Sequence, residues 1–207
     1  MTIHVVLGFV SGGLSLFAYC LYIYSIWWGN TRPSRSSWWI LTVVWGVLFA
    51  SSLSLGGEND WVAYVERAIQ LTYVIGSLAI AISTIWRGQN EQWGLTGWLC
   101  AGAAGIALVL YFIGQDYLIL SLAMSTLADF FGIWPTIQNA RKYPENEHLL
   151  AWEIEVTASI IALGAISVWA LSWGSAGAYL PVFYLIAING AITFLIRSGL
   201  RRQALTT

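Results

Sequence analysis

The chain has 207 residues and a formal net charge of −1; 58% of its residues are hydrophobic and only 9% are charged. A soluble globular protein carries roughly 25% charged residues, so this chain cannot cover a water-exposed surface with polar groups. Its mean hydropathy of +0.69 agrees with that conclusion. The composition predicts an integral membrane protein, and the small net charge offers no electrostatic basis for binding nucleic acid.

Seven apolar segments are each long enough to cross a bilayer as a helix, which takes about 20 residues. In chain order they cover residues 3–27, 38–55, 61–86, 94–113, 117–139, 149–171 and 180–196. The third is the least clear, because Glu66, Arg67 and Gln70 interrupt its start. Barrel strands would be about 9–11 residues long with alternating polarity, so the segments predict an all-α integral membrane fold of seven transmembrane helices.

Basic residues outside the spans lie in every second loop. The loops that follow spans 1, 3, 5 and 7 contain Arg32, Arg35, Arg87, Arg141, Lys142, Arg197, Arg201 and Arg202. The loops at the other end contain no lysine or arginine and hold only Glu58, Asp60 and Asp116 as charged residues. The positive-inside rule then places the N-terminus outside and the C-terminus in the cytoplasm. We expect a multi-pass protein of the cell membrane.

The chain also contains a weak internal repeat. Span 1 and span 5 both end in a polar, basic turn that holds one proline, and Pro33 and Pro144 are 111 residues apart. The same shift carries spans 1, 2 and 3 onto spans 5, 6 and 7. The sequence therefore predicts a first three-helix repeat (residues 1–88), a linker helix (89–114), and a second, parallel three-helix repeat with a short basic C-terminal tail (115–207).

Two motifs extend this pattern. The stretch from Pro135 to Lys142 contains a proline inside a span followed by a basic turn, and Asn189-Gly190 lies within span 7. In these motifs and in its 3+1+3 organisation the chain resembles the PQ-loop group of seven-helix proteins, as a divergent member similar to the SWEET sugar transporters. That resemblance implies a transporter with Asn189 at its substrate site. Cystinosin-like members imply proton coupling through an aspartate near the Pro135 motif.

Asp129 is the strongest candidate for a functional residue. It lies near the middle of span 5, where an ionisable side chain costs about 2.5–3.5 kcal/mol on insertion scales and is retained mostly for a cavity or a partner. It belongs to one helical face, with the members Ser121, Ser125, Asp129, Gly132, Thr136 and Asn139. We expect this face to point into the bundle, with Gly132 and Pro135 as a hinge. A carboxyl that alternates between its neutral and charged forms could couple proton movement to solute movement. A structural hydrogen bond or ion pair is the alternative.

Polar residues on other spans complete the predicted pathway: Gln70, Tyr73, Trp152, Glu155 and Asn189. Amides, hydroxyls and aromatic rings would suit a sugar, whereas Asp129 or Glu155 could hold the ammonium group of an amino acid. The prediction is a transporter that moves a small polar solute by alternating access around a midplane site. Packing between helices is the competing explanation for the small hydroxyl residues.

Other function classes fit less well. A membrane receptor of the KDEL-receptor type is the main alternative, although the spans contain few cations to bind a peptide carboxylate. The chain's one lysine, Lys142, is in a loop, which argues against a retinal Schiff base. No residue set has the spacing of a catalytic or metal site, so we expect no enzyme activity, no metal and no cofactor. Besides the solute, we expect lipid, possible protons and a possible homo-oligomer as partners.

Overall fold

The structure is a computed structural model that describes residues 3–29, 31, 33, 35–56, 64–65, 67–88, 94–166 and 173–205. These residues form seven long α-helices and two short 3-10 helices. The long helices are α1 (Ile3–Trp27), α2 (Arg35–Gly56), α4 (Ala68–Arg87), α5 (Leu95–Ile113), α6 (Leu118–Lys142), α7 (Leu149–Ala165) and α8 (Trp173–Ala204). The 3-10 helices, Gln115–Tyr117 and Pro144–Asn146, precede α6 and α7.

The helices follow the predicted spans closely. Within the described part of the chain, six of them are long and apolar enough to cross a membrane. The seventh, α7, has 17 residues. At about 1.5 Å per residue it is still about 26 Å long, close to the thickness of a hydrocarbon core. The chain is an all-α, multi-pass membrane protein.

Four helix boundaries differ from prediction by more than three residues: the start of α4, the end of α7 and both ends of α8. Helix α7 ends at Ala165 instead of residue 171, and residues 167–171 lie outside the described residues. Helix α4 begins at Ala68 rather than at residue 61, and residues 61–63 and Glu66 lie outside the described residues. Arg67 is buried, and its Nε donates a hydrogen bond to Ser52 Oγ on α2 at 3.0 Å. A polar residue at the start of this segment therefore bonds to a neighbouring helix instead of reaching toward the lipid headgroups.

Helix α8 is longer than predicted at both ends, covering Trp173–Ala204 instead of 180–196. Pro181 is therefore a buried residue inside the helix rather than a residue at its entrance. Prolines are tolerated within membrane helices because neighbouring groups can satisfy the carbonyl that they release. At the other end, the helix continues past the predicted span through Arg201, Arg202 and Ala204, which are good helix formers.

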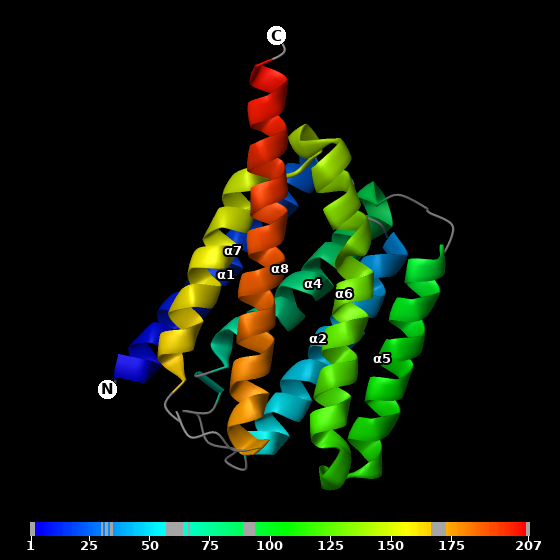
Figure 1. Ribbon diagram of the computed structural model, residues 1–207, viewed down its shortest axis with the longest axis vertical. Helices are drawn as coiled ribbons and strands as arrows, with labels where there is room; N and C mark the ends of the chain where they lie inside the picture. Colours follow the sequence, from blue (N-terminus) through cyan, green and yellow to red (C-terminus); the bar gives the residue numbers. More distant parts are fainter. Residues whose placement is uncertain are drawn as a thin grey trace.

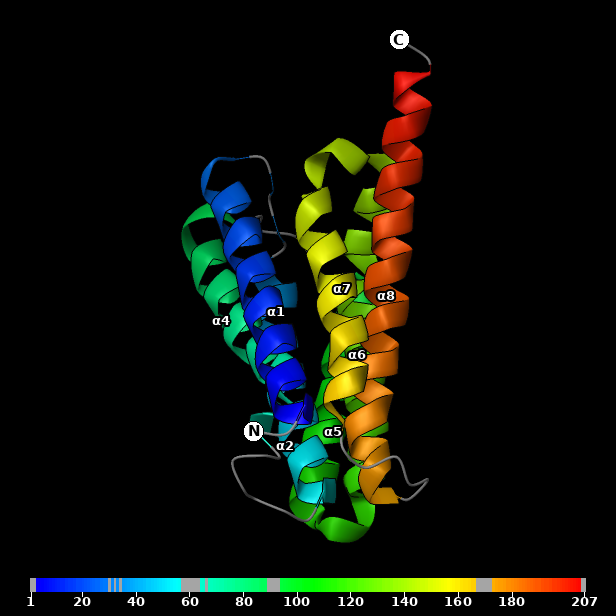
Figure 2. The same ribbon diagram turned by 90° about the vertical axis from the view of Figure 1, so that its left-hand side faces the viewer.

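The helices pack in a pattern that recurs. Helix α4 packs against both α1 and α2, and α8 packs against both α6 and α7. Two further pairings, α1 with α7 and α2 with α6, join these two sets of three helices, and α8 also touches α2. Figure 2 shows α1 and α4 on one side and α7 and α8 on the other. Helix α5 stands outside, against α6 and α2.

Helix direction places the basic residues of the last helical turns at one end of the molecule. Helices α1, α4, α6 and α8 all run toward the end where the C-terminus lies, and α2, α5 and α7 run back (Figure 1). Arg87, Arg141, Lys142 and Arg201 stand in the last turns of three of these ascending helices. We call this the basic end of the bundle.

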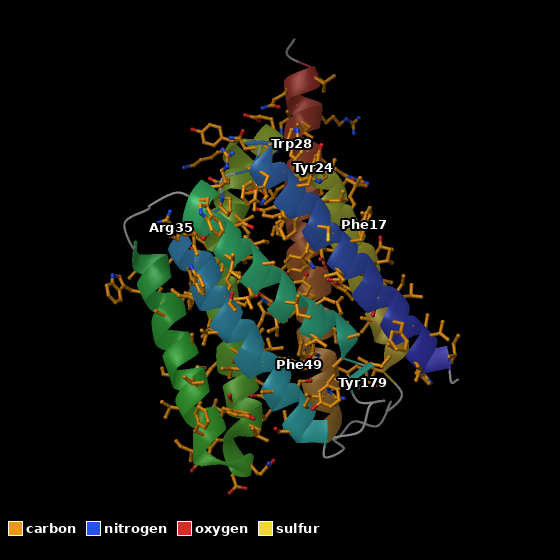
Figure 3. The ribbon with its side chains drawn as sticks, turned by 180° about the vertical axis from the view of Figure 1, so that it is seen from behind. Phe17, Tyr24, Trp28, Arg35, Phe49 and Tyr179 are labelled. Carbon is orange, nitrogen blue, oxygen red and sulfur yellow. The ribbon has the colours of Figure 1, made fainter. Side chains whose placement is uncertain are left out.

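The outer surface is apolar and aromatic. Along α1, Phe17, Tyr24 and Trp28 are exposed by 53%, 54% and 67% (Figure 3). Near the basic end, Arg35 donates from Nε to the Thr84 carbonyl at 3.1 Å and from Nη2 to the Ile85 carbonyl at 2.9 Å, which satisfies the end of α4. Such a surface suits lipid along its length and headgroups at its rim.

Candidate functional site

A cavity lies among six of the seven long helices. Its volume is about 50 Å³, room for a few water molecules, since one water needs roughly 10–15 Å³. The lining residues are Ala18, Tyr19 and Tyr22 of α1, Trp38, Leu41 and Trp45 of α2, Tyr73 and Ile80 of α4, Asp129 and Ile133 of α6, Ala151, Trp152 and Glu155 of α7, and Leu185, Ile188 and Asn189 of α8. We call it the central cavity. None of the described residues of α5 belongs to this lining.

Most of the predicted pathway residues meet there. Tyr73, Asp129, Trp152, Glu155 and Asn189 come from four different helices and all line the central cavity. The structure thus brings together side chains that are up to 116 residues apart in the chain, such as Tyr73 and Asn189.

Three predicted residues lie elsewhere. Gln70 is 1% exposed and outside the cavity lining, and its Oε1 is a buried atom without a hydrogen-bond partner. Gly132 is a packing position, because a Cβ there would stand 2.5 Å from Leu41 Cδ2 and 3.0 Å from Cys100 Sγ. Pro135 lies inside α6, which continues without a break to Lys142. Its action as a hinge stays a prediction.

Asp129 is held by donors from two helices. Its carboxylate accepts a hydrogen bond from the Tyr184 hydroxyl on α8 at 2.5 Å and another from the Trp45 indole on α2. The carboxylate is buried, at 4% exposure. These three residues, Asp129, Tyr184 and Trp45, form what we call the Asp129 cluster.

Glu155 has a different set of partners. The Ser15 hydroxyl on α1 lies 3.0 and 3.1 Å from its two carboxylate oxygens, and the Tyr73 hydroxyl on α4 also donates to it. The Tyr73 oxygen in turn accepts a hydrogen bond from Asn189 Nδ2 on α8 at 2.7 Å. We call Glu155, Ser15, Tyr73 and Asn189 the Glu155 cluster. It connects four helices through one continuous chain of hydrogen bonds.

Aromatic rings form much of the remaining wall. Tyr73 meets Tyr19 edge to face with ring centroids 5.4 Å apart, and Trp45 lies 4.4 Å from the same Tyr73 ring. Nearer the basic end, Tyr22 packs against Trp38 at 5.9 Å and against Trp152 at 6.2 Å. Offset and edge-to-face contacts of this kind favour a rigid wall over a mobile one.

A loop carboxyl stands next to this wall at the basic end. Glu147, between the second 3-10 helix and α7, accepts a hydrogen bond from Trp152 Nε1 at 3.3 Å. Glu147 is half-buried, and burial raises the pKa of its carboxyl to about 7, although the bond from Trp152 works against that rise. Thr31 donates to the Asn146 carbonyl at 3.4 Å, which ties the two proline-containing turns together.

Sequence reasoning missed Tyr19, Trp45 and Tyr184, because aromatic residues in an apolar span look the same whether they face lipid or a cavity. One signal was available for Tyr184: it stands 111 residues after Tyr73, the shift that relates Pro33 to Pro144. Both tyrosines donate to a buried carboxylate. The predicted internal repeat could therefore have identified Tyr184.

The central cavity has the chemistry of a binding site. Two carboxyls, an amide and several aromatic rings converge on one space, which suits recognition of a small ligand. Within the part of the chain that the structure describes, the lining holds no serine, threonine or cysteine beside a histidine that would mark a nucleophile and its base. No protein-family model, curated protein or solved structure matches this chain.

Proposed function

We propose that this protein is a membrane transporter that moves a small polar solute by alternating access around the central cavity. The observation that carries the proposal is the place of the Asp129 and Glu155 carboxyls in one cavity between two sets of three helices. Ionisable groups at membrane depth mark solute or proton pathways more often than they mark simple packing.

Two parallel three-helix repeats joined by α5 would supply the moving parts. Their packing order supports this arrangement, since the third helix lies between the first two in each set. The cavity lining supports it too, because Ala18 and Asp129, Tyr22 and Ile133, and Leu41 and Trp152 are pairs 111 residues apart that all line it. A two-fold axis through the cavity relates such pairs, and rocking of one set against the other would open it to alternate sides.

We assign the basic end to the cytoplasm, with the N-terminus outside, on the positive-inside rule. The directions of the helices are consistent with this assignment (Figure 1). The C-terminal part of α8, with Arg201 and Arg202 exposed, would then extend into the cytoplasm of the cell. We propose the cell membrane as its location.

Uptake into liposomes tests the proposal. Purified protein is reconstituted, and uptake of labelled sugars and amino acids is measured with and without a pH gradient, alongside protein-free liposomes. We expect saturable uptake of at least one solute class, and uptake driven by the gradient would add proton coupling. A folded protein that transports nothing in this panel or the cation panel below would overturn the transporter and favour a receptor. An uptake that is unchanged in Asp129→Asn, gradient response included, would remove Asp129 from the mechanism.

A further inference from the structure

The central cavity is unbalanced in charge. It is lined by two carboxyls, Asp129 and Glu155, and among the described residues its lining contains no lysine, arginine or histidine. The side chains that donate to these carboxylates are hydroxyls and an indole, which are neutral. A buried carboxylate without a cationic partner is costly, so the site favours a ligand that brings positive charge with it.

The arginines nearest the bundle interior are engaged elsewhere. Arg67 bonds to Ser52 on α2, and Arg35 bonds to the carbonyl groups that end α4. At the surface, Arg197 pairs with Glu153 at 2.8 Å. None of these three guanidinium groups belongs to the cavity lining, so none neutralises Asp129 or Glu155 there.

The walls of the cavity add a second attraction for a cation. Tyr19, Tyr22, Trp38, Trp45 and Trp152 line the cavity as aromatic rings. An ammonium group placed over such a ring is attracted by its quadrupole, and the attraction grows when water is excluded. Carboxylates together with aromatic rings are the chemistry that recognises alkylammonium ions.

We propose that the solute of this transporter is a small organic cation whose ammonium group lies among Asp129, Glu155 and the aromatic rings of the central cavity. This inference rests on the proposed function. A zwitterionic amino acid fits less well because its carboxylate would meet two like charges and no cation. A sugar fits less well because it brings no positive charge to the two carboxyls of the lining. The cavity, at about 50 Å³, must widen to admit either kind of solute, since even benzene occupies a cavity of about 150 Å³.

Choline is a suitable first probe, since its quaternary ammonium keeps its charge at every pH and does not cross bilayers freely. The control ligand is 3,3-dimethylbutan-1-ol, which has the same shape without the charge. Binding of each ligand to the purified protein is measured by tryptophan fluorescence and by calorimetry. Both measurements use the same fixed concentration of sodium chloride. We expect choline to bind at least about tenfold more tightly than the neutral alcohol, the difference that one buried charge interaction produces. Equal binding of the two, or binding of neither, would overturn the inference.

Conservative variants locate the site. Asp129→Asn and Glu155→Gln each keep the size of the side chain and an acceptor oxygen, and we expect each to weaken choline binding by about tenfold or more. Glu153→Gln is the matched control, because Glu153 lies on α7 beside Glu155 but pairs with Arg197 outside the cavity. Near-ultraviolet circular dichroism verifies that each variant is folded. Weakening by Glu153→Gln alone would place the cation elsewhere and overturn the inference.

Transport separates this inference from the proposed function. Uptake of labelled choline into liposomes, competed by tetramethylammonium and not by glucose or alanine, would support both. Uptake of a sugar or neutral amino acid without choline would keep the transporter and overturn the cation. Binding of choline without uptake of any solute would keep the cation site and overturn the transporter. Displacement of choline by sodium ions at equal concentration would overturn the preference for an organic cation.

Discussion

The Asp129 cluster and the Glu155 cluster are alike in depth and different in connection. Asp129 takes one bond from Tyr184, on a helix of its own set, and one from Trp45 in the other set. Glu155 takes both of its donors, Ser15 and Tyr73, from the opposite set. The Glu155 cluster therefore fastens the two sets together, whereas Asp129 is attached to one residue of each set. If the sets rock, the Glu155 cluster must rearrange and the Tyr184–Asp129 bond can persist.

A tightly packed glycine lies beside each cluster, and replacing it by alanine has the largest expected effect on stability. A Cβ at Gly76 would lie 2.3 Å from Tyr19 Cγ, near the attachment of a buried ring that packs on Tyr73. A Cβ at Gly132 would meet mainly the terminal Cδ2 of Leu41, which can rotate away. We expect Gly76→Ala to destabilise the protein by about 1–3 kcal/mol and Gly132→Ala by clearly less.

Thermal melting of the purified proteins in detergent measures this pair. Equal losses would mean that the two clusters are packed with equal rigidity. The same variants test the predicted hinge, because Gly132→Ala should slow transport at nearly unchanged melting temperature if α6 bends there. Unchanged transport would leave Gly132 as a packing residue only.

Tyr73 and Tyr184, which stand 111 residues apart, provide a smaller and sharper test. Tyr73→Phe removes the donor to Glu155 and the acceptor of the Asn189 amide, whereas Tyr184→Phe removes only the donor to Asp129. At about 1 kcal/mol for each hydrogen bond, we expect the free energy of unfolding to fall by about 2 kcal/mol in Tyr73→Phe and by about 1 kcal/mol in Tyr184→Phe. Melting in detergent checks the order, and a double-mutant cycle of Tyr73→Phe with Glu155→Gln should show coupling. Additive losses would mean that the Tyr73–Glu155 bond contributes nothing to stability.

Much of the fold was predictable from the sequence because lipid imposes strong constraints. Hydropathy located seven helices, and the described segments agree to within three residues apart from the start of α4, the end of α7 and the two ends of α8. The ends of α8 were missed because helix continuation through Pro181 or past Arg197 depends on neighbours and on local propensity, which a hydropathy pattern does not report.

The site was less predictable, for a geometric reason. Helical spacing shows which residues share a face, and this was sufficient to place Asp129 and Ser125 in the interior. The prediction was wrong for Asn139, at the basic end of the same face, which is exposed. Helical spacing also does not show what stands opposite that face. Gln70 and Tyr73 are three residues apart on α4 and both buried, yet only Tyr73 reaches the cavity. Polar character also could not reveal Trp45, whose role comes from the carboxylate that another helix brings to it.

Glu147 is a third carboxyl to compare with Asp129 and Glu155, and it lies outside the membrane-spanning helices. Its substitution has the smallest expected effect on stability. Burial raises the pKa of the Glu147 carboxyl to about 7 in the folded chain, whereas the pKa of a glutamate in an unfolded chain is about 4.3. Between these values the folded state binds more protons, so stability falls as pH rises through the interval. Glu147→Gln should flatten this fall and stabilise the protein at pH 8, by about 1 kcal/mol once solvent screening is allowed for.

Glu145 is the control for the sign of that effect. It is exposed, and a hydrogen bond from Gln203 at 2.9 Å lowers the pKa of its carboxyl. The stability that Glu145 contributes to the folded state is therefore present above its unfolded pKa and is lost as pH falls through its folded pKa. This is the reverse of the effect expected for Glu147. Melting temperatures from pH 4 to 9 for the wild type and both Gln variants check the pair. If Glu147→Gln left the pH dependence of the melting temperature unchanged, the Glu147 carboxyl would be fully hydrated in solution. The basic end of the cavity would then be more open to water than the hydrogen bond between Glu147 and Trp152 implies.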